Sequence, residues 1–223
     1  MTAYIYMYMY REQHRSMIST MFARILLLFL LPLCAAAAVV VPATVDDVQE
    51  IIDPSQPQEY FGALSGFPQT FEFSVGDTQP FSATVYVYSR NDIAPKAVLL
   101  LTKKERRGVS EIGRTKGKTE AWEREEDRWL ALPFRNGGML QTELKTGTYR
   151  LEVSSPDNDA RYRVVINDYA GGWYGTRLHT LFSVYHLYGI PLYRTVLSPL
   201  VYLPLLLGVA VCVFLWYRRK KAR

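Results

Sequence analysis

The stretch FEFSVGDTQPFSATVYVY, residues 71–88, alternates apolar and polar side chains at every second position. A period of two is typical of β-strands that have one buried and one exposed face. Gly76 and Asp77 interrupt the alternation, and both residue types favour turns. The stretch therefore predicts two half-buried strands joined by a turn. Their inward-facing positions are Phe71, Phe73, Val75, Phe81, Ala83, Val85 and Val87.

Further strand patterns follow on the C-terminal side. Residues 97–102 form a continuous apolar run, which suits a central strand. Residues 129–134 and 139–144 flank the sequence Asn-Gly-Gly at 136–138, which is a strong turn signal and predicts a hairpin.

The last two strand patterns are residues 147–153 and 162–166, on either side of the turn-forming sequence at 156–159. They predict a final strand pair. No convincing helix falls among these segments. Seven or eight short strands at this spacing predict an all-β fold, a single jelly-roll-like β-sandwich over residues 67–169.

The closing strands resemble a known family. Residues 145–153 read KTGTYRLEV, and residues 160–166 read ARYRVVI. With Gln79-Pro80-Phe81-Ser82, these segments resemble the bacterial pre-peptidase C-terminal domains, jelly-roll-like modules that are appended to secreted proteins. The positions that carry the resemblance are Gly147, Thr148, Tyr149 and Tyr162. It implies a fold and a binding or stabilising role, and the acidic middle strand of the family is not evident at 97–102.

The C-terminal end predicts a membrane anchor. Residues 195–217 contain no charged side chain, and this length matches the hydrocarbon core of a bilayer. The basic tail, residues 218–223, would stay in the cytoplasm, which predicts a single-pass protein of the cell membrane with its N-terminal domain outside the cytoplasm. The topology residues are Arg218, Arg219, Lys220, Lys221 and Arg223. Lys220 and Lys221 also resemble a dilysine retrieval signal, so an endoplasmic reticulum membrane with a lumenal domain is the alternative.

The N-terminal end predicts export. Residues 21–38 combine Arg24, an apolar run and the alanine run 35–38, as a secretory signal peptide does, although an uncleaved signal anchor stays open. Residues 1–20 are a doubtful leader, and residues 39–66 are an acidic, turn-rich lead-in to the sandwich. Cys34 would leave with the signal and Cys212 lies in the anchor, so the exported domain would fold without disulfides.

A hinge and an interfacial helix are predicted between the sandwich and the anchor, at residues 170–194, and the part from Trp173 to Tyr188 is called here the collar. Apolar side chains recur at helical spacing over 176–188, which predicts a short amphipathic helix on the membrane surface that ends at Gly189. Pro199 and Pro204 would loosen the outer half of the anchor, so a partner helix is expected there. The candidate membrane-interface and partner residues are Trp173, Tyr174, Leu178, Leu181, Phe182, Tyr185, Tyr188, Gly208 and Cys212.

Charge patterns add little chemistry. The basic run at 103–118 is followed by an acidic run at 120–127, and a long hairpin would let the two neutralise each other. The basic run has no interleaved aromatic residues, so we expect no nucleic-acid binding. His179 and His186 have no third metal ligand nearby. The sequence names no catalytic residue, metal site, cofactor or small-molecule ligand.

The function predicted from these features is binding. The chain would be a single-pass, membrane-anchored accessory subunit whose partners are the lipid bilayer and a membrane protein. One alternative is an enzyme of unrecognised type, or an accessory domain of an enzyme, in the periplasm or lumen. The other is a glycan-binding or adhesive sandwich, which would need an exposed aromatic platform drawn from Tyr86, Tyr88, Trp122 or Trp129.

Overall fold

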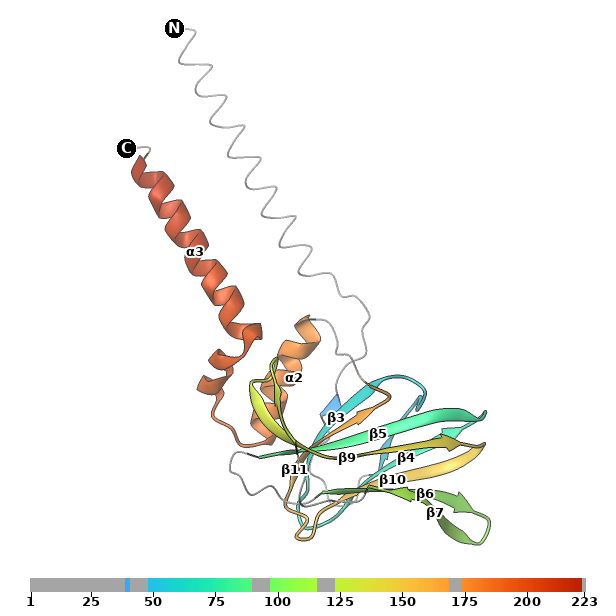
Figure 1. The fold of residues 1–223 in the computed structure, drawn as a ribbon. Helices are drawn as coiled ribbons and strands as arrows, with labels where there is room; N and C mark the ends of the chain where they lie inside the picture. The colour runs from blue at the N-terminus through green and yellow to red at the C-terminus, as the bar shows by residue number, and fades with distance from the viewer. Residues whose placement is uncertain (1–38, 41–47, 90–96, 116–122, 169–173, 222–223) are drawn as a thin grey trace, which may run out of the picture. The chain divides into compact units, whose positions relative to one another are not determined.

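The computed structural model shows a β-sandwich followed by a long apolar helix (Figure 1). The structure describes residues 39–40, 48–89, 97–115, 123–168 and 174–221. The sequence-predicted leader and signal peptide, residues 1–38, lie outside these ranges. The predicted fold class, a β-sandwich with a C-terminal membrane helix, is confirmed for the described part of the chain.

Two sheets make up the sandwich. The six-stranded sheet has, in spatial order, β1 (Val39–Val40), β3 (Gln58–Ala63), β11 (Arg161–Ile166), β5 (Gln79–Tyr88), β9 (Leu132–Leu144) and β8 (Arg124–Asp127). The five-stranded sheet has β2 (Gln49–Glu50), β4 (Gln69–Val75), β10 (Gly147–Ser154), β6 (Val98–Glu105) and β7 (Gly108–Arg114). Except for the short parallel pairs of β1 with β3 and β2 with β4, neighbouring strands are antiparallel.

The inner faces of the two sheets enclose one core, called here the sandwich core. Phe73 of β4 stacks on Phe81 of β5 and on Tyr149 of β10, with ring centroids 5.3 and 5.8 Å apart. All seven inward positions predicted from residues 71–88 are buried in it. The period-two pattern therefore identified the inner face of both strands correctly.

The sandwich begins earlier than residue 67. β3 lies between β1 and β11 in the six-stranded sheet, and its Tyr60 and Phe61 are buried on opposite faces. The predicted lead-in, residues 39–66, therefore supplies a full strand of the sheet, although residues 41–47 of it are not described. The pattern of β3 was missed because the strand is short and contains Glu59 and Gly62 among acidic, turn-forming neighbours.

The predicted hairpin at Asn136-Gly137-Gly138 is wrong. Residues 132–144 form one continuous strand, β9, and the register of β9 against β5 shifts between Thr84 and Tyr86. Gly138 has a φ of 109° and donates its N–H to the Asn136 side-chain oxygen at 2.8 Å. This geometry is a β-bulge, in which an extra residue reverses the facing of all the residues beyond it. As a result, Phe134 lies on the outer face of the sheet, while Leu140 lies on the inner face.

The predicted last strand pair is also wrong. β10 belongs to the five-stranded sheet and β11 to the six-stranded sheet, so the chain crosses between the sheets at 155–160. Asn158, at a φ of 44°, closes this turn because its side-chain oxygen accepts the N–H of Ser155 at 3.0 Å. A turn signal marks where a strand ends, but it does not say whether the next strand pairs with it.

The described strands of the two charge runs do not pair with each other. β6 and β7 form a short hairpin within the basic run, with its tip at 105–108. β8, which carries most of the acidic run, pairs with β9 in the other sheet. The predicted self-neutralising hairpin is therefore not formed by the described residues; Lys116, Lys118 and Glu120 lie outside them.

Three helices follow the sandwich: α2 (Tyr174–Leu187), the 3-10 helix η1 (Leu192–Leu197) and α3 (Pro199–Lys221). α2 ends before Gly189, which has a φ of 62°, as predicted. α3 begins four residues after the predicted 195, because Pro199 suits the first turn of a helix and the Ser198 hydroxyl accepts the N–H of Leu200 at 3.2 Å. Pro199 therefore starts the helix instead of kinking it. Among the described residues, α3 is the one helix that is long and apolar enough to cross a membrane.

Gly62 provides the first test of the packing. It lies opposite Tyr162 in the β3–β11 pair, and a Cβ at Gly62 would be 2.2 Å from the Tyr162 hydroxyl oxygen. Because Tyr162 is fully buried, its ring cannot move aside freely. We predict that Gly62→Ala lowers the free energy of unfolding by about 3 kcal/mol, measured by urea denaturation of the full chain in mild detergent. Gly76→Ala is the matched control and should change it by less than about 0.5 kcal/mol, because a Cβ there meets nothing within 4 Å. Equal losses would contradict this packing.

Candidate functional site

A second apolar cluster joins the sandwich to the membrane helix, and it is called here the junction core. It forms on the outer face of the six-stranded sheet, where α2 covers the strands. Its buried members are Phe61, Leu130, Leu132, Phe134, Leu181, Val184, Tyr185, Tyr188, Ile190 and Leu200. Because Leu200 belongs to the first turn of α3, the sandwich and the anchor share one core.

Three hydroxyl groups lock this junction. Tyr185 donates to the carbonyl of Leu130 at 2.9 Å, and Tyr188 donates to the carbonyl of Tyr162 at 2.6 Å. The hydroxyl of Ser198, just before α3, donates to the carbonyl of Trp129. These bonds connect α2 and the residue before α3 to the backbone of the six-stranded sheet and of the turn at 127–131.

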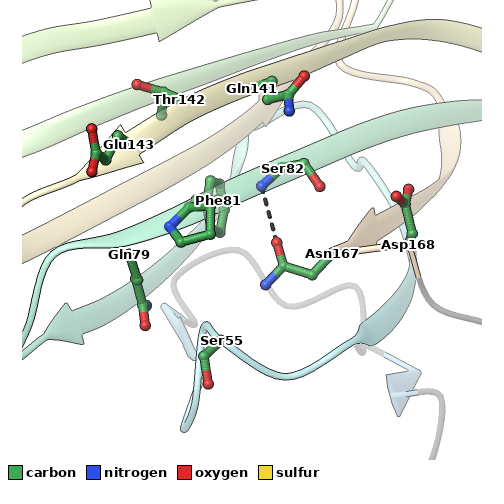
Figure 2. A pocket seen from close by; sticks show the side chains of 10 residues that line it. Ser55, Gln79, Phe81, Ser82, Gln141, Thr142, Glu143, Asn167 and Asp168 are labelled. Atoms are coloured by element: carbon green, nitrogen blue, oxygen red, sulfur yellow. Dashed lines mark hydrogen bonds between the residues drawn. The ribbon is translucent and has the colours of Figure 1, made fainter.

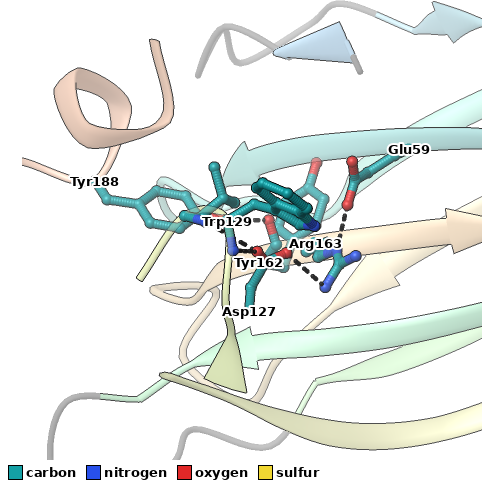
Figure 3. Close-up of polar contacts among 7 residues, drawn as sticks. Glu59, Asp127, Trp129, Tyr162, Arg163 and Tyr188 are labelled. Carbon is teal, nitrogen blue, oxygen red and sulfur yellow. Dashed lines mark hydrogen bonds and ion pairs between the residues drawn. The ribbon is translucent and has the colours of Figure 1, made fainter. Parts of the chain in front are cut away.

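A buried ion cluster lies beside the junction core. Arg163 of β11 donates through Nε to Glu59 of β3, and its Nη1 lies 3.4 Å from Oδ2 of Asp127 (Figure 3). The guanidinium is also 5.1 Å from the ring centroid of Tyr86 and 5.7 Å from that of Phe134. Opposite charges and aromatic faces thus surround a cation that burial would otherwise make costly.

Asp127 connects the ion cluster to the anchor. Its Oδ1 accepts the N–H groups of Trp129 and Leu130, both at 2.9 Å, and so closes the turn at 127–131. The carbonyls of the same two residues accept the hydroxyls of Ser198 and Tyr185. A continuous chain of polar contacts therefore runs from Arg163, near the middle of the sheet, to the first turn of α3.

The pKa shifts in the cluster follow from burial and charge. Burial raises the pKa of Glu59 above its ordinary value, although the neighbouring Arg163 opposes the rise. Burial lowers the pKa of Arg163, but attraction to Glu59 and Asp127 outweighs it and leaves the pKa above its ordinary value. The arrangement suits a structural role, because the cation is enclosed by carboxylates and rings that fix its position.

The predicted collar residues are divided by the structure. Leu181, Tyr185 and Tyr188 are buried in the junction core, and Leu178 packs against it, so this face contacts the chain's own sandwich and not a membrane surface. Phe182 is 43% exposed. Trp173 lies outside the described residues, and the side chain of Tyr174 is not described. An amphipathic pattern identifies an apolar face but not the surface that covers it.

A different apolar surface is exposed next to the anchor. It belongs to η1, directly before α3, and we call it the η1 patch. Its members are Leu192, Tyr193, Val196 and Leu197, which are 57%, 73%, 50% and 68% exposed. The sequence analysis assigned Leu192 and Tyr193 to the segment 170–194, and Val196 and Leu197 to the membrane helix 195–217. The patch is separate from the membrane helix because η1 ends at Leu197 and α3 begins at Pro199, after Ser198.

The remaining predicted residues lie on α3. A Cβ at Gly208 would meet nothing within 4 Å, and Cys212 is exposed. The basic residues Arg218, Arg219, Lys220 and Lys221 occupy its last turn, and Arg223 lies beyond the described residues. Among the described residues, nothing covers Gly208 or Cys212, the positions proposed for a partner helix.

A cavity of about 580 Å³ lies at the N-terminal end of β5 (Figure 2). The side chain of Asn167 connects two segments beside the cavity: its oxygen accepts the N–H of Ser82 at 3.0 Å, and its nitrogen donates to the carbonyl of Pro54 at 2.8 Å. Asn167 and Asp168 both have positive φ, 50° and 48°. The lining residues are Ser55, Gln79, Pro80, Phe81, Ser82, Gln141, Thr142, Glu143, Asn167 and Asp168. In the part of the chain that the structure describes, no group of three or more His, Cys, Asp or Glu side chains could hold a metal ion.

The aromatic platform needed for the glycan-binding alternative does not form from the described candidates. Tyr86 and Tyr88 are partly buried and pack against the junction core. Trp129 is 46% exposed, but the guanidinium of Arg177 lies over its ring at 5.0 Å. Trp122 lies outside the described residues.

Comparison with known proteins yields weak likenesses. No family model and no curated protein matches the chain. One similar solved structure is the pre-peptidase C-terminal domain of a collagenase from Bacillus anthracis, with 12% identity, a TM-score of 0.37, and coverage of 56% of this chain and 98% of that domain. Another is a β-glucosidase from Paenibacillus barengoltzii, with 15% identity, a TM-score of 0.28, and coverage of 57% of this chain and 13% of that chain. The weak resemblance predicted from the sequence is thus found again, and the fold itself rests on the two sheets.

Tyr185 tests the lock at the junction. We predict that Tyr185→Phe lowers the free energy of unfolding of the full chain by about 2 kcal/mol, because the carbonyl of Leu130 loses its buried donor. Tyr193→Phe is the control, since Tyr193 is 73% exposed and should change little. The measurement is urea denaturation in mild detergent, followed by tryptophan fluorescence. A Tyr185→Phe protein as stable as the control would show that the bond does not hold the junction.

Glu59 tests the ion cluster through pH. Because the pKa of Glu59 is raised in the folded protein, the protonated carboxyl group stabilises the folded state. This stabilisation is fully present below pH 4.5, the ordinary pKa of a glutamate. It is lost as the pH rises through the higher pKa of the folded protein. We predict that the free energy of unfolding of wild type, minus that of Glu59→Gln, falls as pH rises over this window. Glu143→Gln, at an exposed carboxylate, should not reproduce this slope. A difference that rises with pH would mean that attraction to Arg163 outweighs burial.

Proposed function

We propose that this chain is an accessory subunit that holds a β-sandwich rigidly against a membrane and binds a membrane-protein partner there. The observation that carries the proposal is the junction core, in which Leu200 of the membrane helix packs with Tyr185 and Phe134. A sandwich on a flexible tether would need no such core. A fixed position next to the bilayer is useful to a subunit that must present itself to a neighbour in the same membrane.

The proposed orientation places the sandwich outside the cytoplasm. Support comes from the basic last turn of α3, Arg218 to Lys221, because positive charges favour the cytoplasmic side. The cysteine-free exported domain and the predicted signal peptide at 21–38 agree with export to a bacterial periplasm or cell surface. A lumenal domain in the endoplasmic reticulum membrane is the alternative, and the sandwich would then meet the same kind of interface.

The partner would contact α3 and the η1 patch. α3 has almost no cover within the chain, with 6% of its most apolar window buried. Gly208 and Cys212 are small residues one turn apart, which lets a second helix approach closely. Pro204 removes one backbone N–H from the helix, and neighbouring helices commonly compensate for such a loss inside a membrane. The sequence analysis assigned the apolar face of α2 to contacts with the membrane or a partner, but in the structure this face packs against the sandwich.

Site-specific crosslinking tests the partner surface. A photoreactive amino acid replaces Leu197 in the η1 patch, and in the control it replaces Val109 on β7, which is 66% exposed and belongs to the β6–β7 hairpin. We predict that Leu197 gives a discrete crosslinked membrane protein in native membranes and that Val109 does not. Truncation before α2 would be a poorer test, because it would bare Phe61 and Phe134.

The outcomes are separable. A protein crosslinked from Val109 alone would move recognition to the sandwich. Crosslinks from Leu197 to lipid alone would leave the chain anchored but without a partner at this surface, and the accessory role would fail.

A further inference from the structure

The membrane-proximal part of the chain is cationic. From Tyr174 to Lys221 the sequence contains no Asp or Glu. Before the basic tail it carries Arg177 and His179, and later His186 and Arg194, all on α2 or η1. A surface of one charge sign beside a membrane helix raises the local concentration of anions at that level of the bilayer.

The fold adds another arginine to this region from far away in the sequence. Arg161, at the start of β11, is exposed, and its Nη2 lies 3.6 Å from the position that a Cβ on Gly189 would take. Gly189 is the turn between α2 and η1. Arg161 is therefore brought to the end of α2 that leads into the η1 patch.

Arg194 lies on η1 near the same end of α2. Its backbone N–H donates to the carbonyl of Pro191 at 3.1 Å, so Arg194 lies in the turn of η1 that directly follows Gly189 and the end of α2. In agreement, its charge opposes the rise that burial causes in the pKa of Tyr185. Arg161 likewise opposes the rise that burial causes in the pKa of Tyr188. Both arginines therefore lie close to the last turn of α2, one from the sheet and the other from η1.

The nearest buried carboxylates are already engaged. Glu59 and Asp127 are bound to Arg163 inside the ion cluster. Next to Arg194, in contrast, Leu192 and Tyr193 of the η1 patch are exposed. Guanidinium groups beside exposed apolar side chains, at the start of a membrane helix, match a phospholipid, which has phosphate oxygens above and acyl chains below.

We propose that Arg161 and Arg194, with Leu192 and Tyr193 at the N-terminal end of the η1 patch, form a binding surface for the headgroups of anionic phospholipids in the leaflet next to the sandwich. Val196 and Leu197, which lie nearer to α3, remain available to the protein partner. A guanidinium donates two parallel hydrogen bonds to a phosphate, while Leu192 and Tyr193 insert at headgroup depth. Anionic headgroups are preferred to phosphatidylcholine because choline adds a cation that the arginines repel. The inference rests on the proposed membrane anchoring and names the lipid that the anchored chain selects.

Spin-labelled lipids test this selectivity. The full chain is reconstituted in phosphatidylcholine bilayers that contain spin-labelled phosphatidylglycerol or spin-labelled phosphatidylcholine, and the motionally restricted fraction gives their relative association. We expect wild type to prefer phosphatidylglycerol. The double variant Arg161→Gln with Arg194→Gln should reduce the preference by about fivefold for each arginine, the scale of one basic residue at an anionic surface.

Two controls make the result specific. Arg106→Gln with Arg107→Gln removes the same charge from the exposed tip of the β6–β7 hairpin and should leave the preference unchanged. Arg161→Lys with Arg194→Lys keeps the charge and should retain most of the preference, which also guards against misfolding of the glutamine variant. The basic tail is the same in every protein, so its own attraction cancels from the comparison.

Unchanged selectivity in the glutamine variant would overturn the proposal. An equal loss in the hairpin control would also overturn it, because net charge alone would then explain the effect. Partner crosslinking from Leu197 is measured separately, so failure of lipid selectivity and failure of the accessory role can be told apart.

Discussion

The six-stranded sheet has two apolar faces, and the rest of the structure follows from the need to cover both. Adjacent residues of one strand show the constraint: Tyr60 enters the sandwich core, while Phe61 enters the junction core. An apolar outer face left in water would cost roughly 25 cal/mol for each Å² exposed. The five-stranded sheet covers the inner face and α2 covers the outer face, so the helix before the anchor is an integral layer of the fold.

The bulge in β9 lets a single strand serve both cores. Phe134 precedes it and faces α2, while Leu140 and Leu144 follow it and face the other sheet. Without the extra residue, positions of the same parity would all lie on one face of the sheet. The sequence Asn136-Gly137-Gly138, which predicted a hairpin turn, instead forms the bulge that lets β9 contribute side chains to both cores.

Polar contacts give this layered structure a fixed relation to the membrane helix. Arg163 pairs with Glu59 and Asp127, and the turn that Asp127 closes receives the hydroxyl of Ser198 at the start of α3. Burying these charges costs desolvation free energy, but their directional contacts favour one arrangement of the sheet and the turn at 127–131. These contacts connect the sandwich to the start of α3, and the exposed apolar side chains of η1 lie directly before that helix.

The sequence by itself determined the elements whose signal is local. Alternation over residues 71–88 fixed two strands and their inner faces, and an uncharged run followed by basic residues marked the anchor. It could not determine which strands pair, because β10 and β11 are separated by the same turn chemistry that a hairpin would use. Nor could it assign a cover to the apolar face of α2, since a helix of that pattern can lie on lipid, on a partner or on its own sheet. Those choices depend on contacts between residues far apart in the chain, such as Tyr185 with Leu130 and Ser198 with Trp129, and only the tertiary structure decided them.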